Sequence, residues 1–382
     1  MAFSLSSMNR REHDSTSVAH EAAAQLTVRL SALRANYRAV TSRVAGVTVA
    51  PVVKADAYSL GMCPVARALA EAGADIFFVA RLEEGIALRL LNRAARIVVL
   101  DGVMRGTAPV LAAHALTPVL NSLDEISEWS EFARGRKERL SAILHVDTGM
   151  NRSGLSREDV SVLSARARDM LSGIELVLIM SHLACADEPE HPLNRAQLER
   201  FRSALARLPP AAASLAASAG IELGRDYAFD MVRPGIALYG GNPVPSIPNP
   251  YATVARLTSR VLQLRQVAKG ETVGYGAVFT TRRPSSIALV AAGYADGLIR
   301  ASSISGFAAI GGHRVPFAGR VSMDLAVIDV TDLPPGLVAR GTEVEFLGDA
   351  ISLSDAASAA GTIAHEVLTS ITPRARRIYV DT

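Results

Sequence analysis

Short apolar strands alternate with helices through the first two thirds of this sequence. From about residue 26, runs rich in β-branched residues recur, with helix-patterned stretches between most of them. The predicted strands span 47–53, 76–79, 97–100, 117–120, 143–146, 176–179, 213–217 and 231–238. Strands that alternate with helices in this way are typical of an α/β protein built on a (β/α)8 TIM barrel, whose active site lies at the carboxyl ends of the strands. We therefore predict a barrel over residues 25–241.

The pattern changes after Tyr239. The segment GGNPVPSIPNP is rich in Gly and Pro, which is typical of a linker. Beyond it, the sequence favours strands at 252–267, 286–292, 308–310, 315–318, 325–330 and 343–347, with helices near 353–360 and 363–371. This predicts a smaller, β-rich C-terminal domain over residues 242–382. Residues 1–24 show neither pattern, and we expect a disordered leader there.

Composition narrows the class of protein. The formal net charge is +3 and the basic residues are scattered, without the basic patch that nucleic-acid binding requires. No apolar run is long enough to span a membrane, and the N-terminal segment lacks the apolar core of a secretory signal. Cys63 and Cys185 lie far apart without metal-type spacing, which fits a reducing compartment. We therefore expect a cytoplasmic protein without nucleic-acid or membrane partners.

A lysine follows the first predicted barrel strand, in the segment PVVKADAYSLG. A strand's carboxyl end faces the barrel mouth, so Lys54 is placed to react there. Desolvation lowers the pKa of such an amine and suits it to form a Schiff base. On this segment alone, a lysine that extends from a strand end to solvent is an equally good interpretation.

The segment around Lys54 resembles the cofactor-lysine motif of alanine racemases, which are barrel-type (fold type III) pyridoxal-phosphate enzymes. Further segments resemble motifs of the same family, in the family's order: HVDTGMNRSG, MSHLACADE, SLAASAG, MVRPGIALYG, VGYGAVF, GYADGLIR and GRVSMD. The resemblance covers nearly the whole chain from about Gln25. One of these motifs alone would be weak, whereas the ordered set is specific.

The resemblance implies a cofactor site for pyridoxal 5'-phosphate at the barrel mouth. The residues that match the family's cofactor-binding positions are Lys54, Tyr58, His182, Ser218, Arg233, Gly235 and Ile236. Lys54 would carry the cofactor, and Arg233 would donate to the pyridine nitrogen, because a guanidinium has donors only. His182 would link Arg233 to Tyr275 through hydrogen bonds. Barrels commonly bind phosphate at the ends of their seventh and eighth strands, where Ser218, Gly235 and Ile236 fall.

The resemblance also implies a two-base racemisation of alanine that supplies D-alanine for peptidoglycan. Lys54 would take the proton from the D isomer, and Tyr275 would take it from the L isomer on the opposite face. The residues implied for substrate binding are Arg152, Tyr294, Met323 and Asp324. The family's active sites are shared across a two-fold homodimer, so Tyr275 would come from the second subunit.

Each of these residues has an ordinary interpretation when it is taken alone. Arg233 could form a surface ion pair, and His182 could be a structural histidine. Ser218 could cap a helix, and Tyr275 could end a strand. The functional interpretation therefore depends on the whole set of motifs.

The sequence departs from the family pattern near the expected site. His145 occupies the position of a lysine that is often carbamylated and steadies the carboxylate-binding arginine, and a histidine cannot carry a stable carbamate. Ala217 replaces an asparagine before Ser218, and Pro373 replaces an inner-gate tyrosine. Ser59 and Leu60 replace a glycine and a histidine after Tyr58. These changes concern rate and substrate range more than the type of reaction.

Three alternatives stay open at this point. A serine or broad-specificity racemase would use a similar mechanism. A non-catalytic pyridoxal-phosphate carrier would resemble the barrel alone, so VGYGAVF and GRVSMD argue against it. A barrel-type decarboxylase usually has a cysteine motif in its β domain, whereas Cys63 and Cys185 both lie in the predicted barrel.

Overall fold

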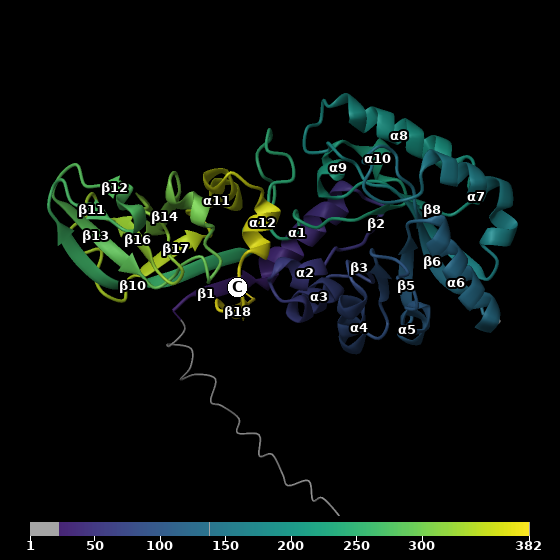
Figure 1. The fold of residues 1–382 in the computed structure, drawn as a ribbon, viewed down its shortest axis with the longest axis horizontal. Helices are drawn as coiled ribbons and strands as arrows, with labels where there is room; N and C mark the ends of the chain where they lie inside the picture. The colour runs from purple at the N-terminus through teal and green to yellow at the C-terminus, as the bar shows by residue number, and fades with distance from the viewer. Residues whose placement is uncertain (1–22, 137, 382) are drawn as a thin grey trace, which may run out of the picture.

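The computed structural model describes residues 23–136 and 138–381 and contains a parallel barrel and a β-rich domain (Figure 1). The barrel strands are β2 (Thr48–Val49), β3 (Ile76–Val79), β4 (Arg96–Val99), β5 (Leu116–Leu120), β6 (Leu140–His145), β7 (Ile174–Met180), β8 (Ala212–Ser214) and β9 (Met231–Val232). Strands β3 to β8 form one continuous parallel sheet. Strand β2 pairs with β9 in parallel. Parallel bridges between Val52 and Phe78 and between Ala217 and Arg233 close the ring.

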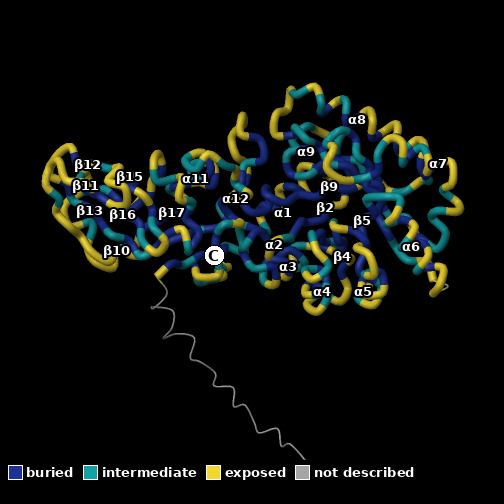
Figure 2. The backbone as a smooth tube through the Cα atoms, in the orientation of Figure 1, coloured by how far each residue is buried: buried dark blue, intermediate teal, exposed yellow. Residues whose placement is uncertain are grey.

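The predicted TIM barrel is thus confirmed, with eight parallel strands in the described part of the chain. The last strand is shorter than the predicted 231–238, because Pro234 has no N–H for a ladder and the chain turns after Arg233. Helices pack around the barrel: α1 (Leu30–Arg43), α3 (Met62–Glu71), α4 (Leu82–Leu91), α5 (Ala108–Ala113), α6 (Leu123–Arg136), α7 (Arg157–Met170), α8 (Pro192–Leu205), α9 (Ser218–Glu222) and α10 (Arg225–Ala228). Figure 2 shows buried strands inside and exposed residues on the outer helices.

The C-terminal domain is β-rich, as predicted; its strands pair mostly in antiparallel, and two helices accompany them. Its strands are β10 (Ala255–Val267), β11 (Thr272–Val273), β12 (Phe279–Thr280), β13 (Ser285–Val290), β14 (Phe307–Ile310), β15 (His313–Pro316), β16 (Ala326–Asp329), β17 (Glu343–Leu347) and β18 (Arg376–Val380). The helices are α11 (Leu353–Ala360) and α12 (Ala364–Thr369). The long strand β10 is the centre of this domain, because it pairs with β13, with β17 and with the N-terminal strand β1 (Gln25–Arg29).

Strand β1 corrects the predicted start of the barrel at residue 25. It pairs with β10 and with β18, so it belongs to the β-rich sheet, and the barrel begins with α1. Alternating burial along QLTVR suits a strand but does not specify which sheet that strand joins. Ala23 and Ala24 also pack into this domain, where their carbonyls accept hydrogen bonds from Ser259 Oγ and the Arg376 N–H. The remainder of the predicted leader, residues 1–22, lies outside the described residues.

The segment that follows β2 adopts an unusual backbone conformation. Five consecutive residues from Ala55 to Ser59 have φ between 52° and 63°, so the short element α2 (Lys54–Tyr58) is a left-handed turn. A left-handed conformation costs roughly 1–2 kcal/mol for each residue with a Cβ. This turn follows β2 and sets the directions of the Lys54 and Tyr58 side chains. Contacts from other parts of the chain must offset the conformational cost of the turn.

Both domains supply those contacts. From the barrel, Glu84 accepts hydrogen bonds from the N–H groups of Ala55 (2.6 Å) and Ala80 (2.8 Å). From the β domain, Arg377 on β18 donates to the carbonyl of Ser59 through Nη2 (2.9 Å) and Nε (3.2 Å). The turn that positions Lys54 is therefore held between a barrel helix and the last strand of the chain.

Replacing Glu84 by Ala tests this anchoring. The variant leaves the N–H groups of Ala55 and Ala80 without their acceptor, which we expect to destabilise the protein by about 1–3 kcal/mol. The neighbouring exposed Glu83 is the matched control, and Glu83→Ala should change stability by less than about 0.5 kcal/mol. Urea unfolding of the cofactor-free proteins measures both. Equal stability of the two variants would contradict the anchoring role of Glu84.

Candidate active site

The structure brings the predicted barrel residues together at one mouth. Lys54 follows β2, Arg152 follows β6, His182 follows β7, Ser218 follows β8 and Arg233 follows β9. The carboxyl ends of the eight strands share one rim, where barrel enzymes place their chemistry. Burial and the nearby Arg152 guanidinium lower the pKa of the Lys54 amine, while Glu84 and Asp101 act in the opposite direction. A neutral amine is the nucleophilic form, so this environment favours attack on a carbonyl.

Arg233 lies inside the mouth and is only 3% exposed. Its guanidinium donates to Ser214 Oγ and to the carbonyl of Ser181 (2.6 Å). It forms no ion pair with any carboxylate of the described chain, and burial lowers its pKa to about 10. A buried guanidinium without a counter-ion is costly unless an acceptor reaches it, which suits a ligand-binding role.

Two histidines next to this guanidinium are neutral at pH 7. Burial and Arg233 lower the pKa of His182 to about 3, and they lower the pKa of His145 to about 4. The structure contains no side-chain hydrogen bond between Arg233 and His182, both of which lie in the described region, so the expected relay is not formed within one chain.

The hydrogen bonds of His145 determine its tautomer. The Nδ2 group of Asn121 donates to the carbonyls of Val119 (2.9 Å) and Leu100 (3.2 Å), so its Oδ1 is the acceptor. His145 Nδ1 lies 2.8 Å from that oxygen and must therefore carry the hydrogen. A neutral His145 keeps its Nε2 lone pair, and the Arg152 charge contributes to its lowered pKa.

A cradle of backbone N–H groups follows β8 and β9. Ser218 Oγ accepts from the N–H groups of Gly235 (2.9 Å) and Ala237 (3.2 Å). Ile236 is buried, and its N–H has no acceptor anywhere in the described residues. Buried backbone N–H groups are almost always paired, so this group indicates a missing acceptor such as a phosphate oxygen.

Tyr58 covers this cradle. A Cβ on Gly235 would collide with the Tyr58 hydroxyl, so only glycine permits the approach. The Tyr58 ring packs at 4.5 Å from the ring of Tyr239, whose hydroxyl donates to the carbonyl of Val52 (2.8 Å). The hydroxyl of Tyr58 is thereby directed at the backbone of Gly235.

The four remaining predicted residues lie together on the β domain. Tyr275 is in the short helix η2 (Tyr275–Ala277), between β11 and β12. The loops that carry Tyr294 and Met323 are joined, since the Tyr294 N–H donates to the carbonyl of Ser322 (3.0 Å). Tyr275, Met323 and Tyr294 are 72%, 54% and 40% exposed. Figure 1 places β11 and β12 at the end of the β domain that is remote from α2, so Tyr275 does not reach Lys54 of its own chain.

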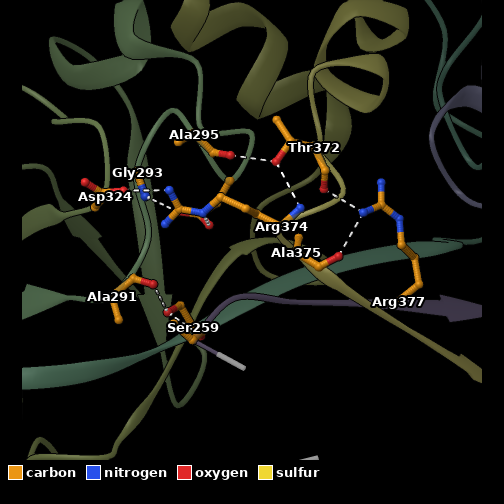
Figure 3. Close-up of polar contacts among 11 residues, drawn as sticks. Ser259, Ala291, Gly293, Ala295, Asp324, Thr372, Arg374, Ala375 and Arg377 are labelled. Carbon is orange, nitrogen blue, oxygen red and sulfur yellow. Dashed lines mark hydrogen bonds and ion pairs between the residues drawn. The ribbon is translucent and has the colours of Figure 1, made fainter. Parts of the chain in front are cut away.

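Asp324 belongs to a network with the C-terminal segment (Figure 3). Arg374 Nη1 donates to Asp324 (2.6 Å), and its Nε lies 3.1 Å from the buried carboxylate of Asp296. Asp324 therefore positions its own loop and does not point freely to a substrate. Through Arg374 and Arg377, residues 372–377 connect this loop to the turn after Lys54.

Sequence reasoning missed three residues near the mouth. Glu84 lies three positions after Arg81, at the start of α4, and accepts a hydrogen bond from the Arg81 N–H (3.1 Å), so its position signals helix capping and not function. Asn121 and His365 have no local signal, because tertiary contacts alone bring them to His145 and Tyr58.

Known proteins match this chain over nearly its whole length. Residues 28–243 match the family model "Alanine racemase, N-terminal domain", and residues 254–379 match "Alanine racemase, C-terminal domain". The chain is 48% identical to a catabolic alanine racemase of Agrobacterium fabrum, over 94% of this chain and 92% of the relative. It is 43% identical to the biosynthetic alanine racemase of the same organism, over 96% of each.

A solved structure has the same fold over nearly the whole chain. The alanine racemase of Bartonella henselae, described with covalently bound pyridoxal phosphate, superposes with a TM-score of 0.90 at 39% identity, over 94% of this chain and all of that chain. The fold and the mouth define a barrel-type enzyme with a buried lysine amine and an unpaired backbone N–H at its strand ends. The chain belongs to the alanine racemase family, and the predicted family, fold and enzyme class are confirmed.

Replacing Gly235 by Ala tests the cradle. The added Cβ would displace the Tyr58 hydroxyl from the cradle, and loss of a hydrogen bond to a charged group costs about 1.5–3 kcal/mol, so affinity for pyridoxal phosphate should fall tenfold or more. Gly135→Ala is the control, since its Cβ meets no atom within 4 Å. Absorbance titration of the apoproteins gives both dissociation constants. Unchanged affinity in Gly235→Ala would place the phosphate elsewhere.

His145 generates a second prediction. Its neutral imidazole carries no carbamate, so the racemisation rate of the wild-type protein should be the same in bicarbonate-free and bicarbonate-containing buffer. His145→Lys should acquire a dependence on bicarbonate, because a lysine amine can be carbamylated. A wild-type rate that falls when carbon dioxide is removed would contradict this.

Proposed function

We propose that two copies of this chain build each active site, and that the dimer interconverts L- and D-alanine with pyridoxal phosphate bound at Lys54. One observation carries this proposal: Lys54 and Tyr275, the two residues matched to the acid/base pair, lie on remote parts of one chain (Figure 1). A second copy brings its own Tyr275 to the barrel mouth of the first. A two-fold interface is isologous, so one kind of contact completes both sites.

Exposed apolar side chains support the interface. Tyr275, Val278, Met323 and Tyr294 leave 72%, 55%, 54% and 40% of their surface in solvent. These residues belong to neighbouring loops, since the backbone of Arg320 lies beside Gly274 and the loops of Tyr294 and Met323 are hydrogen-bonded. A contiguous patch of this type marks an interaction surface.

The residues at the mouth fit the phosphate, the pyridine ring and the aldehyde of the cofactor. The Ile236 N–H and the Tyr58 hydroxyl would hold the phosphate beside Gly235, and Arg233 would donate to the ring nitrogen. When bound, pyridoxal phosphate withdraws electrons from the Cα of the amino acid and so makes its proton removable. The Arg233 guanidinium stays protonated at neutral pH and transfers no proton, so a pyridine nitrogen facing it would stay an acceptor and the electron withdrawal would stay moderate. Moderate electron withdrawal favours return of the proton to Cα over transamination.

Lys54 and the partner's Tyr275 remove protons from the substrate Cα and return them to it. The lowered pKa of Lys54 gives a larger neutral fraction, which accepts the Cα proton of the D isomer. The partner's Tyr275 accepts the proton of the L isomer on the opposite face. In each direction the other residue returns a proton, so the configuration inverts.

The substrate carboxylate is held from both chains. Arg152 is exposed at the mouth, and no ion-pair partner is seen for it within the described residues. The Met323 N–H is likewise without an acceptor in the described chain, and Tyr294 lies beside it at the entrance. The relatives reported above are named alanine racemases, which favours alanine over serine or a broad substrate set.

The cellular role is D-alanine supply for peptidoglycan in the cytoplasm, where the free thiols of Cys63 and Cys185 remain reduced. The 48% identity to a catabolic relative favours a second candidate, the degradation of D-alanine. Disruption of the gene separates the two roles. A requirement for D-alanine supports the first, and loss of growth on D-alanine as carbon source supports the second.

No helix in the described part of the chain is long and apolar enough to cross a membrane.

Mixing inactive subunits tests the shared site. Lys54→Ala and Tyr275→Phe homodimers should each be nearly inactive. Their heterodimer contains one site with both residues and one with neither, so equal, randomly paired mixtures should regain roughly a quarter of wild-type activity.

Racemisation of alanine after co-refolding, with heterodimers verified by native mass spectrometry, gives the answer. Refolded homodimers of each variant are the controls. If verified heterodimers stay inactive, the shared site is refuted, because a site built within one chain cannot be restored by any pairing.

A further inference from the structure

Helix α12 is the part of the β domain that reaches the cofactor side of the barrel mouth. Figure 1 shows it at the junction of the two domains, and it contacts the turn α2. At its start, Ala364 lies beside Gly241 and Ile236, since a Cβ on Gly241 would be 3.4 Å from that of Ala364. The next residue, His365, packs its ring against Tyr58, with 5.8 Å between ring centroids. Two independent contacts thus place His365 at the cradle formed by Tyr58, Gly235 and Ile236.

The imidazole of His365 is not engaged elsewhere. Its side chain makes no hydrogen bond with any residue in the described ranges, although its carbonyl accepts one from the Thr369 hydroxyl. The ring is also not part of the core, because His365 remains exposed at the mouth. Partial desolvation of the ring and the charge of Lys54 lower the pKa of His365, so the ring is neutral at pH 7 and keeps one N–H donor.

A phosphate in this cradle has more acceptor positions than the donors described so far. The N–H groups of Gly235 and Ala237 are already directed at Ser218 Oγ, which leaves the Ile236 N–H and the Tyr58 hydroxyl. Pro373, on the segment that follows α12, has no side-chain donor. A buried phosphate oxygen without a donor is costly, so a further donor at this rim stabilises the bound anion.

We propose that His365 is a cofactor-binding residue whose imidazole N–H donates a hydrogen bond to the phosphate of pyridoxal phosphate. The donor comes from the C-terminal domain of the same chain that provides Lys54. It adds a contact from α12 to the phosphate side of the mouth. This inference rests on the cofactor site proposed above.

Comparing two forms of the cofactor tests the proposal without measuring catalysis. His365→Phe keeps the ring packing against Tyr58 and removes the donor, whereas His365→Gln keeps a donor. His313→Phe, on the exposed start of β15, is the matched control. Dissociation constants of the apoproteins are measured by absorbance titration with pyridoxal phosphate and with pyridoxal, which has no phosphate.

We expect His365→Phe to weaken binding of pyridoxal phosphate about tenfold, as loss of one hydrogen bond to a charged group predicts, and to leave pyridoxal binding unchanged. His365→Gln and His313→Phe should bind both forms like the wild type. If His365→Phe fails to fold, His365→Ala is measured in the same way and should show the same selective loss.

Two results would overturn the proposal. Equal affinity of the wild type and the donor-free variants for pyridoxal phosphate would mean that His365 does not touch the phosphate. An equal loss for both forms would mean that the ring only packs against Tyr58. A wild-type protein that binds neither form would instead overturn the cofactor assignment, and this inference with it.

Discussion

The left-handed turn after Lys54 is the constraint on which the rest of the site depends. Each of its five residues carries a Cβ and therefore disfavours this conformation by roughly 1–2 kcal/mol. The opposing contacts come from Glu84 in the barrel and from Arg377 in the β domain. The turn directs Lys54 toward the mouth and Tyr58 over the Gly235 backbone, so one strained segment sets both the nucleophile and the phosphate side. Because Arg377 comes from the last strand, the barrel site is complete only when the second domain is docked.

The charges at the mouth explain why such a site takes anions. Lys54, Arg152 and Arg233 converge there, and neither arginine forms an ion pair within the described chain. Burial keeps His145 and His182 neutral, so they add no further repulsion. A cluster of this kind is stable in the presence of a phosphate and a carboxylate, which are the two anionic groups of the proposed cofactor and substrate. The β domain meanwhile presents Tyr275 and Met323 to solvent, away from this cluster.

Much of this arrangement could be predicted from the sequence, for reasons that are local. Buried parallel strands appear as short apolar runs, so the eight strands were recognisable, and residues that follow such strands necessarily meet at one mouth. Strand β1 was assigned to the wrong domain because its alternating pattern does not reveal its partners. The left-handed turn was invisible, since KADAYS contains no glycine and its conformation is imposed by Glu84 and Arg377. His365 and Asn121 were missed for the same reason, because only the folded chain brings them to Tyr58 and His145.

The account depends most directly on a covalent bond between the cofactor and Lys54. The sequence contains three lysines, Lys54, Lys137 and Lys269, so the site of attachment can be assigned without ambiguity. Borohydride reduction of the protein loaded with pyridoxal phosphate fixes the bond, and peptide mapping by mass spectrometry locates it. The account predicts one label per chain on the peptide that contains Lys54, and none in Lys54→Ala. A label on Lys269 or Lys137, or an unlabelled Lys54 in a protein that racemises alanine, would contradict it.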